Sequence, residues 1–65
     1  MKWSDSREIA LALWQLRPEQ DPKTLRFTQL RQWVLELPGF DDQPAHCGER
    51  LLEAIQLAWM EEYED

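Results

Sequence analysis

Prolines divide this 65-residue chain into short segments, and their spacing constrains the fold more than any other feature. Pro18 and Pro22 end any helix that begins near the N-terminus, and Pro38-Gly39 stops a second one. The chain must therefore fold from short elements. A chain of this length has room for one small core, so residues 1–65 are predicted to form a single domain.

Apolar periodicity predicts a first helix between the N-terminus and Pro18. Ser4 and Asp5 are both good N-cap residues, and Glu8 lies three residues after Asp5, as in a capping box. The predicted apolar stripe consists of Ile9, Leu13 and Leu16, widened by Ala10 and Trp14.

The same periodicity predicts two further helices. Thr28 is expected to cap the second helix, and the third begins at residues 47–49 and runs to about residue 63. The stripe of the second helix is Leu30, Trp33, Val34 and Leu37, and that of the third is Leu51, Leu52, Ile55, Ala58 and Trp59. On the third helix Arg50, Glu53 and Gln56 are expected to face outward.

The connecting segments complete the predicted topology. Residues 25–27 have the pattern of a short extended piece, and the loop over residues 40–48 is expected to turn Phe40 inward and Asp41-Asp42 toward water. The order is that of a winged-helix domain without its wing. We therefore predict a mainly α fold, a small three-helix domain of modified winged-helix (helix-turn-helix-like) type with at most a very short β segment.

The charge of the chain argues against nucleic-acid binding, although the topology is that of DNA-binding domains. The net charge is -6 and the sequence pI is about 4.6. In a helix-turn-helix the later helix approaches the phosphates with Lys and Arg. Here the third helix and its approach carry Arg50 as their single Lys or Arg among six carboxylates, so no nucleic-acid partner is expected.

A catalytic or structural-metal site is not expected either. His46 and Cys47 are the single histidine and the single cysteine, and a structural zinc site needs four such ligands. Both residues are interpreted as part of the entry to the third helix. A lone cysteine suits a reducing compartment, and no apolar run is long enough to span a membrane, so a cytoplasmic, soluble protein is expected. It is also expected to be a monomer.

The acidic surface leaves three interpretations open. It can be a solvated surface, it can steer the chain to a basic protein partner, or it can hold hard cations such as iron weakly. The C-terminal acids Glu61, Glu62, Glu64 and Asp65 oppose the dipole at the end of the third helix, as a solubilising tail or as a contact surface.

Several motifs resemble one family almost from end to end. They are KWSDSREI (residues 2–9), DPKTLRFT (residues 21–28), Gln32-Trp33, Phe40-Asp41-Asp42 with Pro44, and LEAI (residues 52–55) with Trp59. These stretches resemble the IscX (YfhJ) family of the bacterial iron–sulfur cluster assembly system.

The resemblance implies a cytoplasmic, non-enzymatic accessory protein with a modified winged-helix fold. Such a protein docks on the cysteine desulfurase IscS in competition with frataxin and binds iron weakly through surface carboxylates, as a regulator or an iron adaptor. An iron-binding chaperone that donates iron without docking on the desulfurase is the alternative. No tightly bound cofactor is implied.

Family positions transfer to this sequence as candidate site residues. The partner-binding candidates are Asp5, Glu8, Asp21, Lys23, Arg26, Asp41, Asp42, Glu61 and Glu62. The candidates for weak iron binding are Asp5, Glu8, Asp41 and Asp42. Lys23 and Arg26 either form salt bridges to the acidic surface or contact an assembly component, and Trp3, Phe27, Trp33 and Trp59 are assigned to the core.

The chain also departs from the family pattern. Gln29, Gln43 and Pro38-Gly39 stand where the family can carry acids. Fewer convergent carboxylates are expected to weaken iron binding more than docking, because docking sums many weak charges while a metal site needs several ligands in one place.

Overall fold

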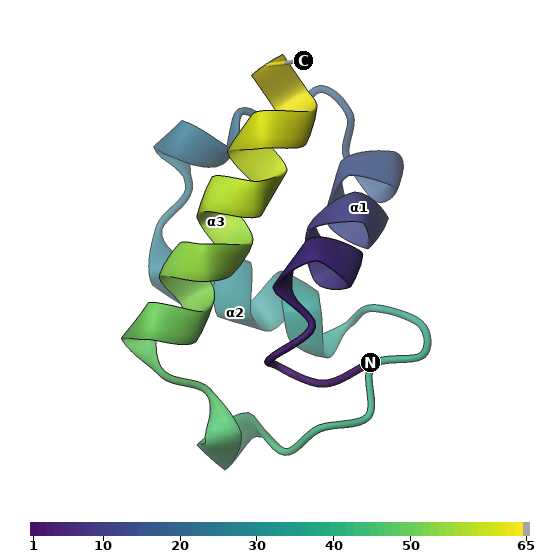
Figure 1. Cartoon of the computed structure of the whole chain (residues 1–65), viewed down its shortest axis with the longest axis vertical. Coiled ribbons are helices and arrows are strands. Elements are labelled where there is room, and N and C mark those ends of the chain that lie inside the picture. Colours follow the sequence, from purple (N-terminus) through teal and green to yellow (C-terminus); the bar gives the residue numbers. More distant parts are fainter. Residues whose placement is uncertain (65) are drawn as a thin grey trace.

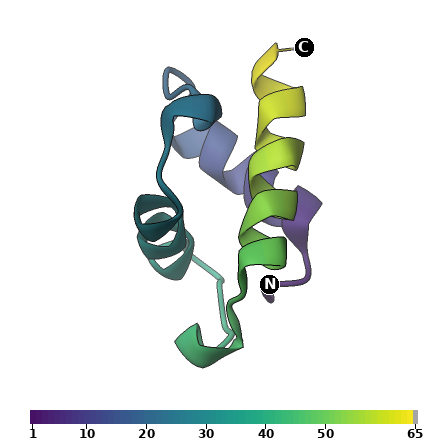
Figure 2. The same cartoon turned by 90° about the vertical axis from the view of Figure 1, so that its left-hand side faces the viewer.

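The longest helix, α3 (Glu49–Glu64), is the element against which the other helices pack. A computed structural model describes residues 1–64, in which α1 (Ser6–Leu16), the 3-10 turn η1 (Pro22–Thr24), α2 (Phe27–Leu35) and the 3-10 turn η2 (Pro44–His46) precede it. Figure 1 shows α1 beside α3 with α2 behind them. Figure 2 shows that α1 crosses behind α3, while α2 lies to one side. The predicted mainly α, three-helix architecture is confirmed, and residues 1–64 contain no β strand.

One hydrophobic core joins the three helices and the N-terminal segment. Its ten members are Trp3, Ile9, Ala10, Leu13, Leu30, Val34, Leu37, Leu52, Ile55 and Trp59. All ten belong to the predicted stripes or to the aromatic residues assigned to the core. Phe27 and Trp33 are half-buried and pack against this core, whereas Leu16 is 60% exposed. The prediction for Leu16 is wrong because this last residue of α1 lies beyond the packed part of the helix.

The helix starts differ in detail from the predicted caps. Asp5 is the N-cap of α1, but its side chain bonds none of the helix N–H groups and instead accepts a hydrogen bond from Lys2 N at 2.8 Å. The predicted capping box with Glu8 is therefore wrong. Arg26, and not Thr28, is the N-cap of α2, because the Arg26 carbonyl accepts the first intrahelical bond. Arg26 is extended, as predicted, while Phe27 already belongs to the helix.

Two polar contacts fasten η1 to α3. The Gln56 side chain was predicted to face outward, but it is half-buried and its Nε2 donates to Pro22 O at 2.9 Å. Lys23 forms an ion pair with Glu64 on the last turn of α3. This pair places a cation where the helix dipole is negative, which offsets part of the cost of the C-terminal carboxylates.

No described helix is long and apolar enough to cross a membrane. The described part of the chain measures 30 × 21 × 16 Å.

The two most buried tryptophans provide a test of the core. Trp3 is 1% exposed and its Nε1 donates to Gln43 O at 2.8 Å, whereas Trp59 is 0% exposed and its Nε1 has no hydrogen-bond partner among the described residues. Both Trp→Phe changes leave a similar cavity, but only Trp3→Phe loses a hydrogen bond. We expect Trp3→Phe to lower the free energy of unfolding by at least about 1 kcal/mol more than Trp59→Phe.

Urea unfolding of the two variants measures this difference. A loss for Trp59→Phe equal to or larger than that for Trp3→Phe would show that the unpaired indole donor carries no free-energy cost.

Candidate docking surface

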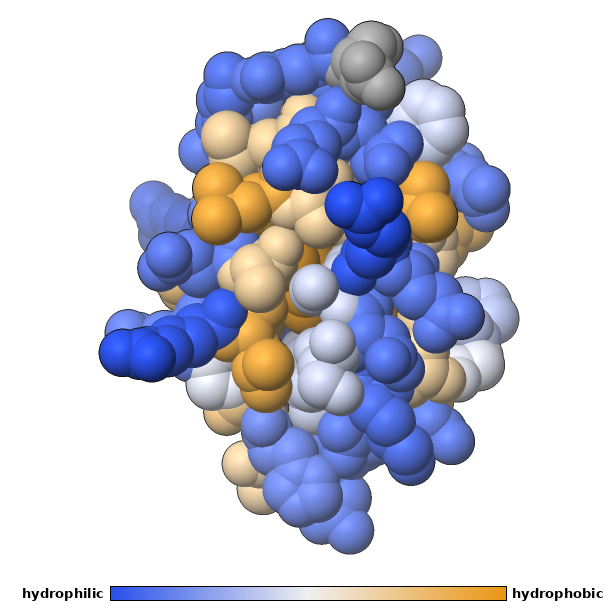
Figure 3. Space-filling model, in the orientation of Figure 1, coloured by the Kyte–Doolittle hydropathy of each residue, from blue (hydrophilic) through white to orange (hydrophobic). Residues whose placement is uncertain are grey.

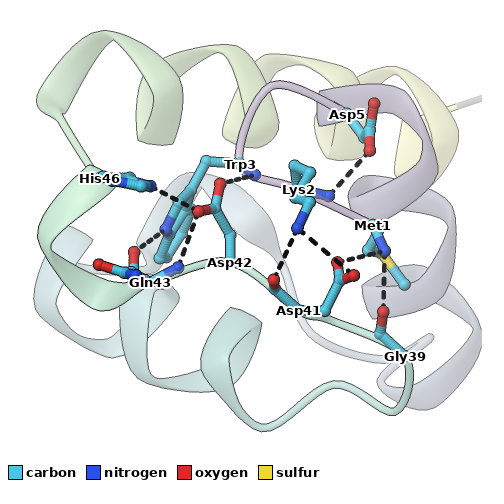
Figure 4. A network of polar contacts seen from close by, with 9 residues as sticks. All are labelled: Met1, Lys2, Trp3, Asp5, Gly39, Asp41, Asp42, Gln43 and His46. Atoms are coloured by element: carbon cyan, nitrogen blue, oxygen red, sulfur yellow. Dashed lines mark hydrogen bonds and ion pairs between the residues drawn. The ribbon is translucent and has the colours of Figure 1, made fainter.

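The first residues of the chain run along the loop that follows α2 and are fastened to it by polar contacts (Figure 4). The N-terminal ammonium donates to Gly39 O at 2.8 Å and to Asp41 Oδ1 at 3.2 Å. Lys2 Nζ donates to Asp41 O at 2.8 Å. Gly39 has φ of +83°, a backbone conformation that glycine adopts readily, and this presents its carbonyl to the ammonium group.

Asp41 and Asp42 occupy different environments although they are adjacent. Asp41 has 66% of its side chain exposed, and its bonds to the ammonium group and Lys2 lower the pKa of its carboxyl. Asp42 is only 15% exposed and accepts from Trp3 N at 3.2 Å and Gln43 N at 2.7 Å, with His46 Nδ1 at 2.6 Å. The prediction that both acids face water is correct for Asp41 and wrong for Asp42.

His46 has a more specific role than the predicted helix entry. It ends η2 and meets the Asp42 carboxylate, a contact that lowers the pKa of Asp42 to about 2, helped by the Gln43 and Trp3 N–H groups. The spacing of four residues between Asp42 and His46 was the available sequence signal. The neighbouring Cys47 thiol is half-buried, and burial raises its pKa.

A second group of acids comes from the start of α1 and the last turns of α3 and surrounds Arg7. One shallow depression is lined by Asp5, Arg7, Glu8 and Leu11 together with Ser4 and Ser6. A second is lined by Arg7, Glu61, Glu62 and Glu64. Arg7 lines both depressions, so the two adjoin at its side chain. We call the residues Asp5, Glu8, Glu61, Glu62 and Glu64, with Arg7 between them, the α1–α3 acidic face.

The carboxylates of this face differ in whether they form ion pairs or hydrogen bonds within the chain. Among residues 1–64, the side chains of Glu8, Glu61 and Glu62 form no hydrogen bond or ion pair, while Glu64 pairs with Lys23. The pair with Glu64 raises the pKa of Lys23. In Figure 3 hydrophilic residues cover the end of α3 at the top, and smaller apolar patches interrupt the surface below. Three carboxylates of the face are therefore available to a partner.

The remaining predicted site residues are dispersed. Asp21 accepts from Lys23 N at 2.9 Å and so caps η1, while Lys23 makes the predicted kind of salt bridge to the acidic surface. Arg26 is exposed and forms no ion pair with another described residue. Asp65, the last acid of the predicted C-terminal group, lies outside the described residues.

The four carboxylates predicted to bind iron are not gathered in one place. Across residues 1–64 no three His, Cys, Asp or Glu side chains come close enough together to hold a metal ion. Asp5 belongs to the α1–α3 acidic face, as does Glu8, whereas Asp41 and Asp42 are bonded to the N-terminal segment.

Comparison with known proteins covers nearly the whole chain. A sequence model of the family described as iron-sulphur cluster assembly matches residues 1–64. Over 62 residues the chain is 53% identical to an uncharacterized protein of Pseudomonas aeruginosa, a match that covers 95% of this chain and 94% of the relative. The polar contacts between residues 1–3 and residues 39–43 fall within the region that the family model matches, as does the α1–α3 acidic face.

The Asp42 contacts predict a specific dependence of stability on acid. The folded-state pKa of Asp42 is about 2, below its ordinary value of 3.8, so its stabilising contribution is present above pH 3.8 and is lost as the pH falls toward 2. Asp42→Asn should therefore lower the free energy of unfolding at pH 7 and flatten its pH dependence between pH 4 and 2.

Urea unfolding at several pH values tests this, with Glu53→Gln as the control. Glu53 is exposed and forms no ion pair among the described residues, so its replacement should change the free energy of unfolding by less than about 0.5 kcal/mol. An unchanged pH profile in Asp42→Asn would contradict the assigned role of this carboxylate.

Proposed function

This chain belongs to the iron–sulphur cluster assembly family, the IscX (YfhJ) family that its motifs resemble, and from that premise we propose that it docks on the cysteine desulfurase IscS through the α1–α3 acidic face. Docking makes it an accessory and regulatory protein of cluster assembly. We propose a binding role without a catalytic step of its own.

The observation that carries this proposal is the shared position of Arg7 in two depressions. It joins the acids at the start of α1 to those at the end of α3, which are more than fifty residues apart in the sequence. Glu8, Glu61 and Glu62 keep their charge free of internal partners among residues 1–64. A net charge of -6 adds a long-range field of the same sign, which steers the chain toward a basic surface.

Competition with frataxin for the desulfurase, which the family resemblance implies, is part of this proposal. The chain acts in this proposal as a monomer in the cytoplasm, where the assembly system operates.

Weak iron binding is the less supported part of the resemblance for this chain. The carboxylate oxygens of Asp41 and Asp42 already contact the ammonium group, Lys2, His46 and backbone N–H groups. An iron ion must therefore displace these donors. Docking needs no such rearrangement. We therefore place docking before iron donation.

Two matched charge variants test which acids meet the desulfurase. Glu61→Gln/Glu62→Gln removes two charges from the α1–α3 acidic face, and Glu49→Gln/Glu53→Gln removes two exposed charges from the first turns of α3. Exposed ion pairs contribute about 0.2–1 kcal/mol each, so the loss of two pairs of about 0.5 kcal/mol each should weaken the binding of the first double variant to purified IscS about fivefold at low salt.

The second double variant carries the same net charge and should bind within about twofold of the unmodified chain. Isothermal titration calorimetry at low and high salt measures both. Equal weakening of the two variants would show that total charge, and not this face, determines docking.

A further inference from the structure

Arg17 is held on the surface in an arrangement that the proposed function does not use. Its Cζ lies 3.9 Å from the centre of the Trp33 ring, and its backbone N–H caps the end of α1 by donating to Leu13 O at 2.8 Å. The guanidinium group and the Trp33 indole face a shallow depression whose other lining residues are Leu16, Pro18, Glu19 and Gln20. The turn that follows α1 lies on the same side of the molecule as α2 (Figure 2).

The guanidinium donors of Arg17 have no acceptor among the described residues. Arg17 is half-buried, and no side-chain hydrogen bond or ion pair accompanies its stacking on Trp33 within residues 1–64. A planar guanidinium group presents paired N–H donors that match the two oxygens of a carboxylate. The contact with the indole restricts the rotamers of the Arg17 side chain, so less rotamer entropy is lost when an acceptor binds.

We propose that the depression around Arg17 and Trp33 binds a carboxylate side chain of an acidic peptide segment on a second protein. Leu16 is 60% exposed, and together with Pro18 it gives the depression an apolar rim. This rim suits a segment in which an acidic residue stands beside an apolar one. The depression is lined by the C-terminal end of α1 and shares no lining residue with the α1–α3 acidic face, and it takes a partner of the opposite charge, so the chain can bridge a basic and an acidic protein.

Two features oppose an anion at this place and define the test conditions. Glu19 lines the same depression, and the net charge of the chain is -6. At an ionic strength of 0.15 M the Debye length is about 8 Å, so distant charges are screened while the contact with Arg17 is not. A carboxylate is favoured over a phosphate because a single guanidinium group beside Glu19 balances one negative charge better than two.

The experiment titrates the full ¹⁵N-labelled chain at that ionic strength with the capped peptide acetyl-Glu-Leu-Glu-Leu-amide. We expect saturable shifts of the Trp33 indole N–H and Arg17 Nε–H signals, with a dissociation constant of about 1 mM. The neutral peptide acetyl-Gln-Leu-Gln-Leu-amide should leave both signals in place. Inorganic phosphate should bind more weakly than the acidic peptide.

Variants distinguish a specific contact with the Arg17 guanidinium group from a general effect of net charge. Arg17→Gln should weaken peptide binding at least about fivefold, as expected for loss of a charge-assisted bidentate contact, and Arg17→Lys should weaken it less. Glu19→Gln should strengthen it. Arg50→Gln, the matched loss of an exposed arginine, should leave it within about twofold. Circular dichroism confirms that each variant is folded.

Several results would overturn the proposal. They are no saturable shift in the unmodified chain, equal shifts with the neutral peptide, tighter binding of phosphate, or equal weakening by Arg17→Gln and Arg50→Gln. None of these depends on the desulfurase, so failure here leaves the proposed docking function standing.

Discussion

The packing of α1 against α3 is the interaction on which the rest of the molecule depends. It buries Ile9 and Leu13 of α1 and Ile55 and Trp59 of α3 in one core, and these two helices make the most extensive contact in the fold. The two helices lie side by side and run in the same general direction (Figure 1), and Arg7 near the start of α1 lines one depression together with Glu61, Glu62 and Glu64 of α3. The α1–α3 acidic face is therefore a consequence of core packing, because residues near both ends of the chain reach one surface only when the two helices are docked.

The acidic composition separates into two physical roles in the structure. Asp42 stabilises the fold, because its carboxylate accepts hydrogen bonds from the backbone N–H groups of Trp3 and Gln43 and contacts His46. Glu61 and Glu62 form no ion pair with another residue in the described part of the chain, so their charges are free to act on a partner. A substitution in the first group is expected to act through stability and one in the second through binding. Net charge alone does not distinguish these roles.

Local pattern was sufficient for the helices and most of the core, because Ile9, Leu30 and Ile55 each recur with helical period on a buried face. It was not sufficient for contacts between distant segments. The hydrogen bond from Gln56 to Pro22 depends on how a loop lies against a helix, and so do the contacts of Asp42. The periodicity of a sequence gives no information about such contacts. The site residues themselves came from a family resemblance, and only the fold shows which of them share a surface.

The most direct test of docking maps the surface that meets the desulfurase. The ¹⁵N-labelled chain is titrated with purified IscS at low and high salt, without iron, and amide signals are followed residue by residue. Docking through the α1–α3 acidic face predicts salt-sensitive shifts or loss of signal at residues 5–8 and 61–64, with the C-terminal end of α1 unaffected. Signals that stay unchanged with the desulfurase but broaden when ferrous iron alone is added would contradict docking and favour the iron-donor alternative.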